Sequence, residues 1–311
     1  NRHQWDIKPE WLVQAPGVVN ALFGIVKTFT EPGDGIIIMQ PVYYPFSAAI
    51  TQNGRELVNN ALIYEDYAYR IDFDDLEKKA KDPKNKMLIL CSPHNPIGRV
   101  WTREELEEVG RICIDNNVLV VSDEIHFDFI LTGHKHTVFA NISEEFAQHC
   151  IICTAPSKTF NIAGLKISNI VIPNDHLRKQ LLEKNQRDFA SNALGIQACR
   201  ICYDDCGAWK DEMLCMIEYN YQQVKKFVEE KLPQIKVIEL QGTYLLWLDC
   251  TALGLSDEEL EKLTLGADLY LDEGYLFGPG GSGFERINLA CPTRYLMAAM
   301  ERFQKAISAL K

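Results

Sequence analysis

The sequence predicts an α/β fold in which a mostly parallel sheet is sandwiched by helices. Helical patterns alternate with five apolar runs of strand length, at residues 35–39, 87–91, 118–122, 150–154 and 168–172. Such alternation is typical of βαβ units, which make consecutive strands parallel. The chain has 311 residues, and a single core stops growing at roughly 250 to 300 residues. We therefore expect two domains.

Helix signals support this alternation. A helical pattern covers residues 21–29, directly after a Pro-Gly turn at 16–17. Residues 102–116 begin with a capping box of Thr102 and Glu105, which satisfies the free N–H groups of the first helical turn. A second capping box, Ser256 with Glu259, predicts a helix in the C-terminal part of the chain.

The domain boundary is predicted from one long helical pattern, which runs from about residue 211 to 231 and stops before Pro233. We expect this helix to connect the two domains. The large domain would cover residues 1–212, and a smaller C-terminal α+β domain would cover residues 213–311.

Composition narrows the class of protein. The net charge is −11 and no stripe of Lys and Arg is sustained, which disfavours nucleic acid and anionic membranes as partners. The longest apolar runs have strand length, and no signal-peptide pattern is visible, so we expect a cytoplasmic protein. We interpret the ten cysteines mainly as buried free thiols. Cys199, Cys202 and Cys206 have ligand-like spacing, but the same spacing marks one helix face, and we predict no metal site.

Three polar side chains follow three different apolar runs. Asn95 and Asp123 come just after the runs 87–91 and 118–122, and Lys158 follows the run 150–154. Because the carboxyl ends of parallel strands meet at one edge of a sheet, we expect these side chains to converge on one ligand. A lysine in such a partly desolvated crevice loses its proton more easily, which suits it to form a Schiff base with an aldehyde.

The motifs around these residues resemble those of fold-type I pyridoxal-phosphate enzymes. They read S-P-x-N-P-x-G at 92–98, D-E-x-H at 123–126 and S-K-T-F-N-x-x-G-L at 157–165. Within the class I and II aminotransferase superfamily, the chain is most similar to the MalY-like cystathionine β-lyases, or C-S lyases. The resemblance extends from about Trp5 to the C-terminus.

This resemblance implies a cofactor, pyridoxal 5'-phosphate, and a role for each motif residue. Lys158 would be the catalytic lysine that binds the cofactor aldehyde. Asp123 would face the ring nitrogen and keep it protonated, and Asn95 would donate to the phenolate oxygen. Tyr43 would stack on the ring, with Tyr44 as a rival. His126 occupies a position where aminotransferases usually have tyrosine, which favours the lyase branch.

The phosphate is expected at the Pro16-Gly17-Val18 turn, where the N–H groups of Gly17 and Val18 would face an anion at a helix N-terminus. Ser157 would add a hydroxyl, and Lys166 stands where relatives carry a phosphate-binding base. Relatives often have serine where this chain has Ala155, so Thr154 or Ser157 would replace that contact.

The substrate's α-carboxylate is expected to bind Arg286, together with Asn95, because a planar guanidinium can donate two parallel hydrogen bonds. Arg294 is the competing arginine. A small amino acid is therefore the expected partner.

The resemblance implies β-elimination on cystathionine or cysteine-type amino acids, giving pyruvate, ammonia and a thiol. The alternatives are an aminotransferase and a non-catalytic regulator with the same fold. A homodimer with shared active sites is also implied. The sequence begins at Asn1 inside the family pattern, so the N-terminal part of the small domain is expected to be missing.

Overall fold

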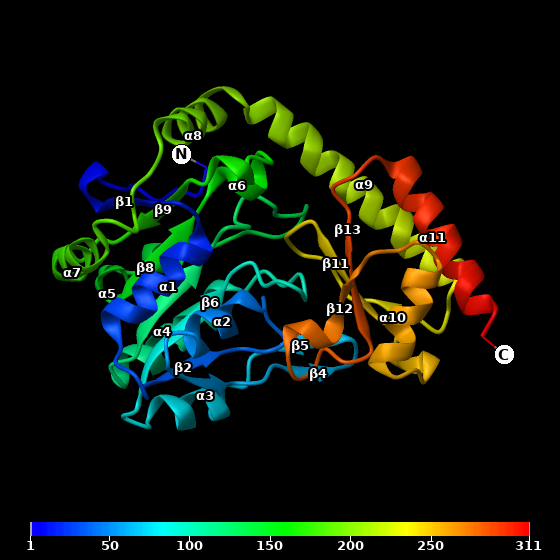
Figure 1. The fold of residues 1–311 in the computed structure, drawn as a ribbon, viewed down its shortest axis with the longest axis horizontal. Coiled ribbons are helices and arrows are strands. Elements are labelled where there is room, and N and C mark those ends of the chain that lie inside the picture. Colours follow the sequence, from blue (N-terminus) through cyan, green and yellow to red (C-terminus); the bar gives the residue numbers. More distant parts are fainter. Residues whose placement is uncertain (1, 311) are drawn as a thin grey trace.

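The computed structural model describes residues 2–310. Its centre is a seven-stranded sheet whose strands, in spatial order, are β1 (Leu12–Ala15), β9 (Ser168–Val171), β8 (Cys150–Thr154), β7 (Leu119–Asp123), β6 (Asn85–Cys91), β2 (Gly35–Ile38) and β3 (Glu56–Asn59). The strands from β3 to β8 in this order are parallel neighbours. Strand β9 is antiparallel to both β8 and β1. The predicted mostly parallel sheet is confirmed, and Figure 1 shows it in the larger part of the molecule.

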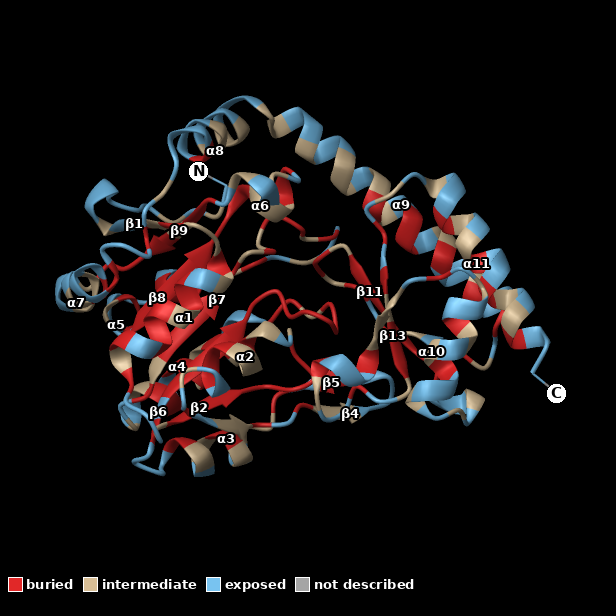
Figure 2. Cartoon of the chain, viewed as in Figure 1, coloured by how far each residue is buried: buried red, intermediate tan, exposed pale blue. Residues whose placement is uncertain are grey.

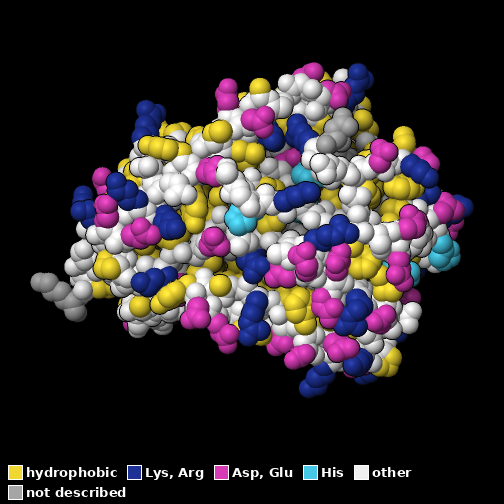
Figure 3. Space-filling view, turned by 180° about the vertical axis from the view of Figure 1, so that it is seen from behind, with side chains coloured by type: hydrophobic (Ala, Val, Ile, Leu, Met, Phe, Trp, Pro, Cys, Tyr) yellow, Lys and Arg dark blue, Asp and Glu magenta, His cyan; other side chains and the backbone are white. Residues whose placement is uncertain are grey.

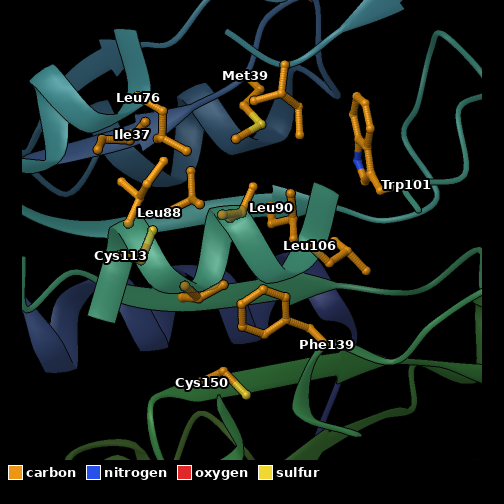
Figure 4. Packing of buried hydrophobic residues seen from close by; sticks show 14 of the residues in the cluster. Ile37, Met39, Leu76, Leu88, Leu90, Trp101, Leu106, Cys113, Phe139 and Cys150 are labelled. Atoms are coloured by element: carbon orange, nitrogen blue, oxygen red, sulfur yellow. The ribbon is translucent and has the colours of Figure 1, made fainter. Parts of the chain in front are cut away.

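Both faces of this sheet are covered because side chains alternate along each strand. In β6, Leu88 and Leu90 belong to one buried cluster, whereas Met87 and Ile89 belong to another on the opposite face. The first cluster packs against α3 (Phe73–Ala80), α4 (Arg103–Asp115) and α5 (Glu144–Gln148), and Figure 4 shows part of it. The second packs against α1 (Val18–Phe29), α2 (Pro45–Thr51) and α7 (Asp175–Asn185). This is a three-layer α/β/α arrangement.

Both predicted capping boxes are present. Thr102 accepts from the N–H of Glu105 at the start of α4, and the Glu105 side chain accepts from the N–H of Thr102 in return. Ser256 and Glu259 make the same reciprocal pair at the start of α10 (Asp257–Gly266). Each such cap stabilises its helix by about 1 kcal/mol.

The C-terminal part of the chain forms a second, smaller sheet with its own buried cluster. Its four antiparallel strands, in spatial order, are β10 (Lys236–Val237), β11 (Leu245–Asp249), β13 (Phe284–Asn288) and β12 (Asp272–Glu273). Helices α9 (Gly207–Lys231), α10 and α11 (Thr293–Ser308) cover it. The long α9 extends from the large sheet to the small one in Figure 1. It begins four residues before the predicted position and ends, as expected, before Pro233.

A hairpin of β4 (Ile63–Glu65) and β5 (Ala68–Arg70) touches the small sheet. The Tyr64 hydroxyl donates to Oδ2 of Asp249 at 2.7 Å, and Trp247 Nε1 donates to the Tyr69 hydroxyl at 3.1 Å. The remaining elements are α6 (Pro156–Thr159), α8 (Ala193–Asp205) and short 3₁₀ turns at Pro9–Trp11, Phe139–Asn141, Ala163–Leu165, Thr251–Leu253 and Gly274–Phe277.

The strands of the large sheet are mostly buried, whereas the outer faces of the helices are exposed, as Figure 2 shows. On the face shown in Figure 3, basic side chains lie scattered among acidic ones. All ten cysteines are free thiols, and five are buried: Cys91, Cys113, Cys150, Cys153 and Cys250. Between residues 2 and 310, no helix combines the length and apolarity needed to cross a membrane. The same residues contain no cluster of His, Cys, Asp and Glu that could hold a metal ion.

Candidate active site

One cavity of about 460 Å³ lies at the carboxyl ends of the parallel strands and extends to the small sheet. It brings together every site residue that the sequence predicted. These lining residues are Gly17, Val18, Tyr43, Asn95, Asp123, His126, Ser157, Lys158 and Arg286.

Three neighbouring strands deliver the three central side chains. Asn95 follows β6, Asp123 is the last residue of β7, and Lys158 lies in α6 directly after β8. The register places Cys91 opposite Asp123 and Asp123 opposite Cys153, so the strands end at nearly the same height. The predicted convergence at one sheet edge therefore follows from the parallel pairing.

The Asp123 carboxylate is 4% exposed, and its Oδ1 accepts the Ile125 N–H at 3.1 Å. Burial raises the pKa of Asp123 to about 7, although this N–H and the positive charge of Lys158 oppose the rise. A carboxylate with so little compensation is stabilised by a cationic group placed against it. The cavity beside Asp123 offers room for one.

The surroundings of Lys158 favour the neutral amine, which is the form that a nucleophile needs. Burial lowers its pKa, the nearby Arg286 cation lowers it further, and Asp123 and Asp272 act in the opposite direction. Thr159, which follows Lys158 in α6, is held in place because its hydroxyl donates to Oδ2 of the buried Asp128 at 2.9 Å. Asp128 thus anchors the short helix that carries the lysine.

Three of the aromatic residues that line the cavity are His126, Tyr43 and Tyr44. Burial lowers the pKa of His126 to about 3, helped by the charges of Lys158 and Arg286, so the imidazole is neutral. Its Nδ1 is buried and has no hydrogen-bond partner among residues 2–310. Tyr43 is half-buried and its N–H donates to the Asn95 carbonyl at 3.0 Å, whereas Tyr44 is exposed. Both tyrosines line the cavity, so Tyr44 remains a rival of Tyr43 for the stacking position on the ring.

The other end of the cavity is suited to an anion. Gly17 is the N-cap of α1 with φ 133°. Within residues 2–310 no side chain caps this helix, and its first N–H groups lack intrahelical partners. A methyl group at Gly17 would meet no other atom within 4 Å, which leaves space for a ligand against the backbone. Ser157 and Lys166 line the same cavity.

Thr154 does not lie at this anion-binding end of the cavity. It is absent from the cavity lining, and its hydroxyl donates to the Asn169 carbonyl at 3.2 Å. Of the two proposed replacements for the serine that relatives have at Ala155, only Ser157 therefore reaches the cavity. The hydrogen bond of Thr154 to strand β9 and its place outside the cavity favour Ser157 of these two alternatives.

Arg286 on β13 enters the cavity from the small sheet. Its Nη1 donates to Oδ1 of Asn95 at 2.8 Å, and its Nη2 donates to Oδ2 of Asp272. The competing Arg294 is exposed on α11 and donates to the hydroxyl of the adjacent Tyr295, outside the cavity. The geometry therefore places Arg286, which the family resemblance favoured, in the cavity and Arg294 outside it.

Tyr244, Asp272 and Asn288 are among the lining residues that sequence reasoning missed. Asp272 lies on a strand of only two residues, and its position opposite Arg286 depends on the turn that joins β12 to β13. No local pattern marks such a residue. Tyr244 had a signal, because it lies within the G-T-Y segment at 242–244 that belongs to the family likeness.

The residues present fit the expected cofactor on structural grounds. The start of α1 at one end of the cavity can bind an anion. The buried Asp123 carboxylate can bind a cationic group, and Lys158, whose pKa is lowered, lies near it. The unpartnered Nδ1 of His126 adds a polar atom close to these groups.

Comparisons with known proteins agree with this geometry. The sequence model for aminotransferases of class I and II matches residues 1–303. The chain is 44% identical over 311 residues to cystathionine β-lyase PatB of Bacillus subtilis, covering 99% of this chain and 80% of that protein. It is 30% identical to protein MalY of Escherichia coli, covering 100% of this chain and 80% of MalY.

Solved structures are similar over the same length. Cystalysin from Treponema denticola, whose crystal structure contains pyridoxal 5'-phosphate, superimposes with a TM-score of 0.98 at 46% identity, covering 100% of this chain and 79% of that one. A PLP-bound C-S lyase from Staphylococcus hominis gives a TM-score of 0.92 at 32% identity, covering 98% of this chain and 78% of that one.

Proposed function

Because this chain belongs to the class I and II aminotransferase family, we propose that it is a pyridoxal-phosphate-dependent carbon–sulfur lyase. It would cleave cystathionine or cysteine-type amino acids by β-elimination and, with water, release pyruvate, ammonia and a thiol. One observation carries the proposal: Lys158, Asp123, Asn95 and Arg286 line a single cavity. The relatives that are cystathionine β-lyases or C-S lyases favour elimination over amino-group transfer.

The cofactor is pyridoxal 5'-phosphate, which supplies an aldehyde that accepts amines and a ring that withdraws electrons from the substrate's α-carbon. Ser157 and the N–H groups at the start of α1 would hold its phosphate, with Lys166 supplying positive charge. Asp123 would hold a proton against the ring nitrogen. Tyr43 would pack on the ring, while Asn95 and His126 would contact its polar edge.

The remaining work is done by side chains that orient the substrate and move its proton. Arg286 and Asn95 would grip the α-carboxylate, which fixes the α-carbon relative to Lys158. Nζ of Lys158, whose pKa is lowered by burial and by Arg286, would take the α-proton. Departure of the thiolate from the β-carbon would then complete the elimination.

The test is to incubate the purified protein with cystathionine and measure pyruvate without an added keto acid. Lys158→Ala should abolish pyruvate release, whereas Lys135→Ala should not, because Lys135 is an exposed loop residue outside the cavity. Amino-group transfer to 2-oxoglutarate without pyruvate release would make the protein an aminotransferase instead. If Lys158→Ala released pyruvate at the wild-type rate, the proposal that Lys158 takes the α-proton would be refuted.

The domain division is part of the proposal. Residues 1–212 would form the large cofactor-binding domain and residues 213–311 the small one. Support comes from the third buried cluster, whose members lie between residues 217 and 307 except for Phe129 and Leu131. Hydrogen exchange in increasing urea should then show the two parts losing protection separately. A single shared transition would contradict the division.

We also propose a homodimer and a cytoplasmic location. The dimer is supported by exposed apolar side chains on α8 and at the start of α9, namely Leu194, Ile201 and Trp209, because exposed apolar surface is typical of interfaces. Free thiols on all ten cysteines suit a reducing compartment. Light scattering after gel filtration tests the dimer, and a monomeric mass would refute it. Cell fractionation tests the location, and recovery outside the cytoplasm would refute it.

A further inference from the structure

The Arg286 guanidinium is already paired within the chain. Nη1 donates to Asn95 at 2.8 Å and Nη2 donates to the Asp272 carboxylate. The guanidinium carbon lies 4.8 Å from the ring centroid of Phe277, and Nε is buried without a hydrogen-bond partner among residues 2–310. Arg286 therefore faces the cavity as half of an ion pair.

The sheet builds this pair. Asp272 on β12 lies directly opposite Arg286 on β13, so the two side chains share one face of the small sheet. The Arg286 side chain is only 10% exposed, whereas that of Asp272 is 42% exposed. Both line the cavity, and Asp272 thus presents negative charge to its solvated part.

The charges that line the cavity disfavour a substrate substituent with a net negative charge. Among residues 2–310, the lining cations are Lys158, Lys166 and Arg286, and the lining carboxylates are Asp123 and Asp272. Under the proposed function, Lys158 moves a proton, Lys166 faces the phosphate and Arg286 binds the α-carboxylate. A second carboxylate with no ammonium group beside it would find no cation of its own among these lining residues and would be repelled by Asp272. The departing half of cystathionine differs, because it carries an ammonium group next to its carboxylate.

We propose that Asp272 is a specificity-determining residue that restricts the site to S-substituted cysteines whose substituent is neutral or bears an ammonium group. The inference rests on the proposed lyase function and adds the substrate class. Asp272 repels a negatively charged substituent, so the site discriminates between substrates that have the same size and shape but differ in charge. It also positions Arg286, since the ion pair holds the guanidinium toward Asn95.

Two nearly isosteric substrates test this inference. S-carbamoylmethylcysteine and S-carboxymethylcysteine differ by an amide against a carboxylate, and pyruvate release from each gives kcat and KM. Wild-type protein should favour the amide by roughly tenfold beyond the effect of the leaving thiol, as expected for one pair of like charges in partly solvated surroundings. Asp272→Asn keeps an acceptor for Arg286 and should remove this preference, mainly through KM.

Glu273→Gln is the matched control, because Glu273 is the next residue on β12 but does not line the cavity. It should keep the wild-type preference. S-aminoethylcysteine should behave oppositely to the carboxylate substrate and lose efficiency in Asp272→Asn. Asp272→Ser removes the same charge and replaces Asp272→Asn if circular dichroism shows that the latter is unfolded.

Equal amide-to-carboxylate ratios in the wild type and the Asp272 variants would overturn the inference and leave the lyase function standing. A folded, cofactor-loaded wild-type protein that releases no pyruvate from either substrate or from cystathionine would overturn the lyase function and the inference with it.

Discussion

Glu285 predicts an unusual dependence of stability on pH. This residue on β13 is 1% exposed, and its Oε2 has no hydrogen-bond partner among residues 2–310. Burial, followed by the negative charges of Glu273, Glu261, Asp257 and Asp272, raises its pKa from 4.5 to about 8. The folded protein therefore keeps a proton that the unfolded chain loses above its ordinary pKa.

The sign follows from proton linkage. Between pH 4.5 and about 8, the folded state binds more protons at Glu285 than the unfolded state does, so this group's contribution makes stability fall as pH rises. Above about pH 8 both states are ionised and the contribution levels off. A shift of this size corresponds to at most about 5 kcal/mol in the free energy of unfolding.

Glu285→Gln removes the titration while keeping the side chain's size. We expect the variant to gain stability relative to the wild type as pH rises from 5 to 9, by as much as about 4 kcal/mol. Urea denaturation at several pH values measures this difference. Glu301→Gln, which removes an exposed carboxylate from α11, should follow the wild-type curve. Parallel curves for the wild type and Glu285→Gln would refute the reasoning.

Three further changes test the site and the core. Asp123→Asn should reduce pyruvate release by on the order of 10²- to 10⁴-fold, because an amide cannot hold a proton at the ring nitrogen; unchanged kcat would contradict this. Asp128→Asn should weaken the anchor on Thr159, a hydrogen bond to a charged group worth about 1.5–3 kcal/mol, and lower the melting temperature; an unchanged melting temperature would count against the anchor. Leu88→Ala should cost about 2–5 kcal/mol in urea denaturation, since Leu88 is fully buried between β6 and its covering helices; a loss below 1 kcal/mol would show that the core refills the gap.

The sequence predicted the centre of the site because each central side chain follows a continuous apolar run. Such runs are buried on both faces, which identifies parallel strands and the edge where Asn95, Asp123 and Lys158 meet. The edge strands β1 and β3 lacked this signal. Strand β3 reads Glu-Leu-Val-Asn and none of its residues is fully buried.

Residues that depend on long-range pairing could not be predicted. Asp272 meets Arg286 only because β12 and β13 pair. Strand β12 has only two residues, which is too short for a pattern of apolar residues to predict how it pairs. Glu285 in the sequence looks like an ordinary strand carboxylate, and only the packed small sheet reveals that it is buried. The choice between Thr154 and Ser157 stayed open for a related reason, since Asn169, the hydrogen-bond partner of Thr154, lies on the antiparallel strand β9.

The β4–β5 hairpin has a mechanical consequence. Its Tyr64 and Tyr69 are fastened to Asp249 and Trp247 of β11, and β11 is hydrogen-bonded to the strand that bears Arg286. Any rocking of the C-terminal sheet that widens the entrance must carry the hairpin with it or break both tethers. Because the indole N–H of Trp247 donates to the Tyr69 hydroxyl, a movement that separates the hairpin from β11 would change the surroundings of this indole and thereby its fluorescence.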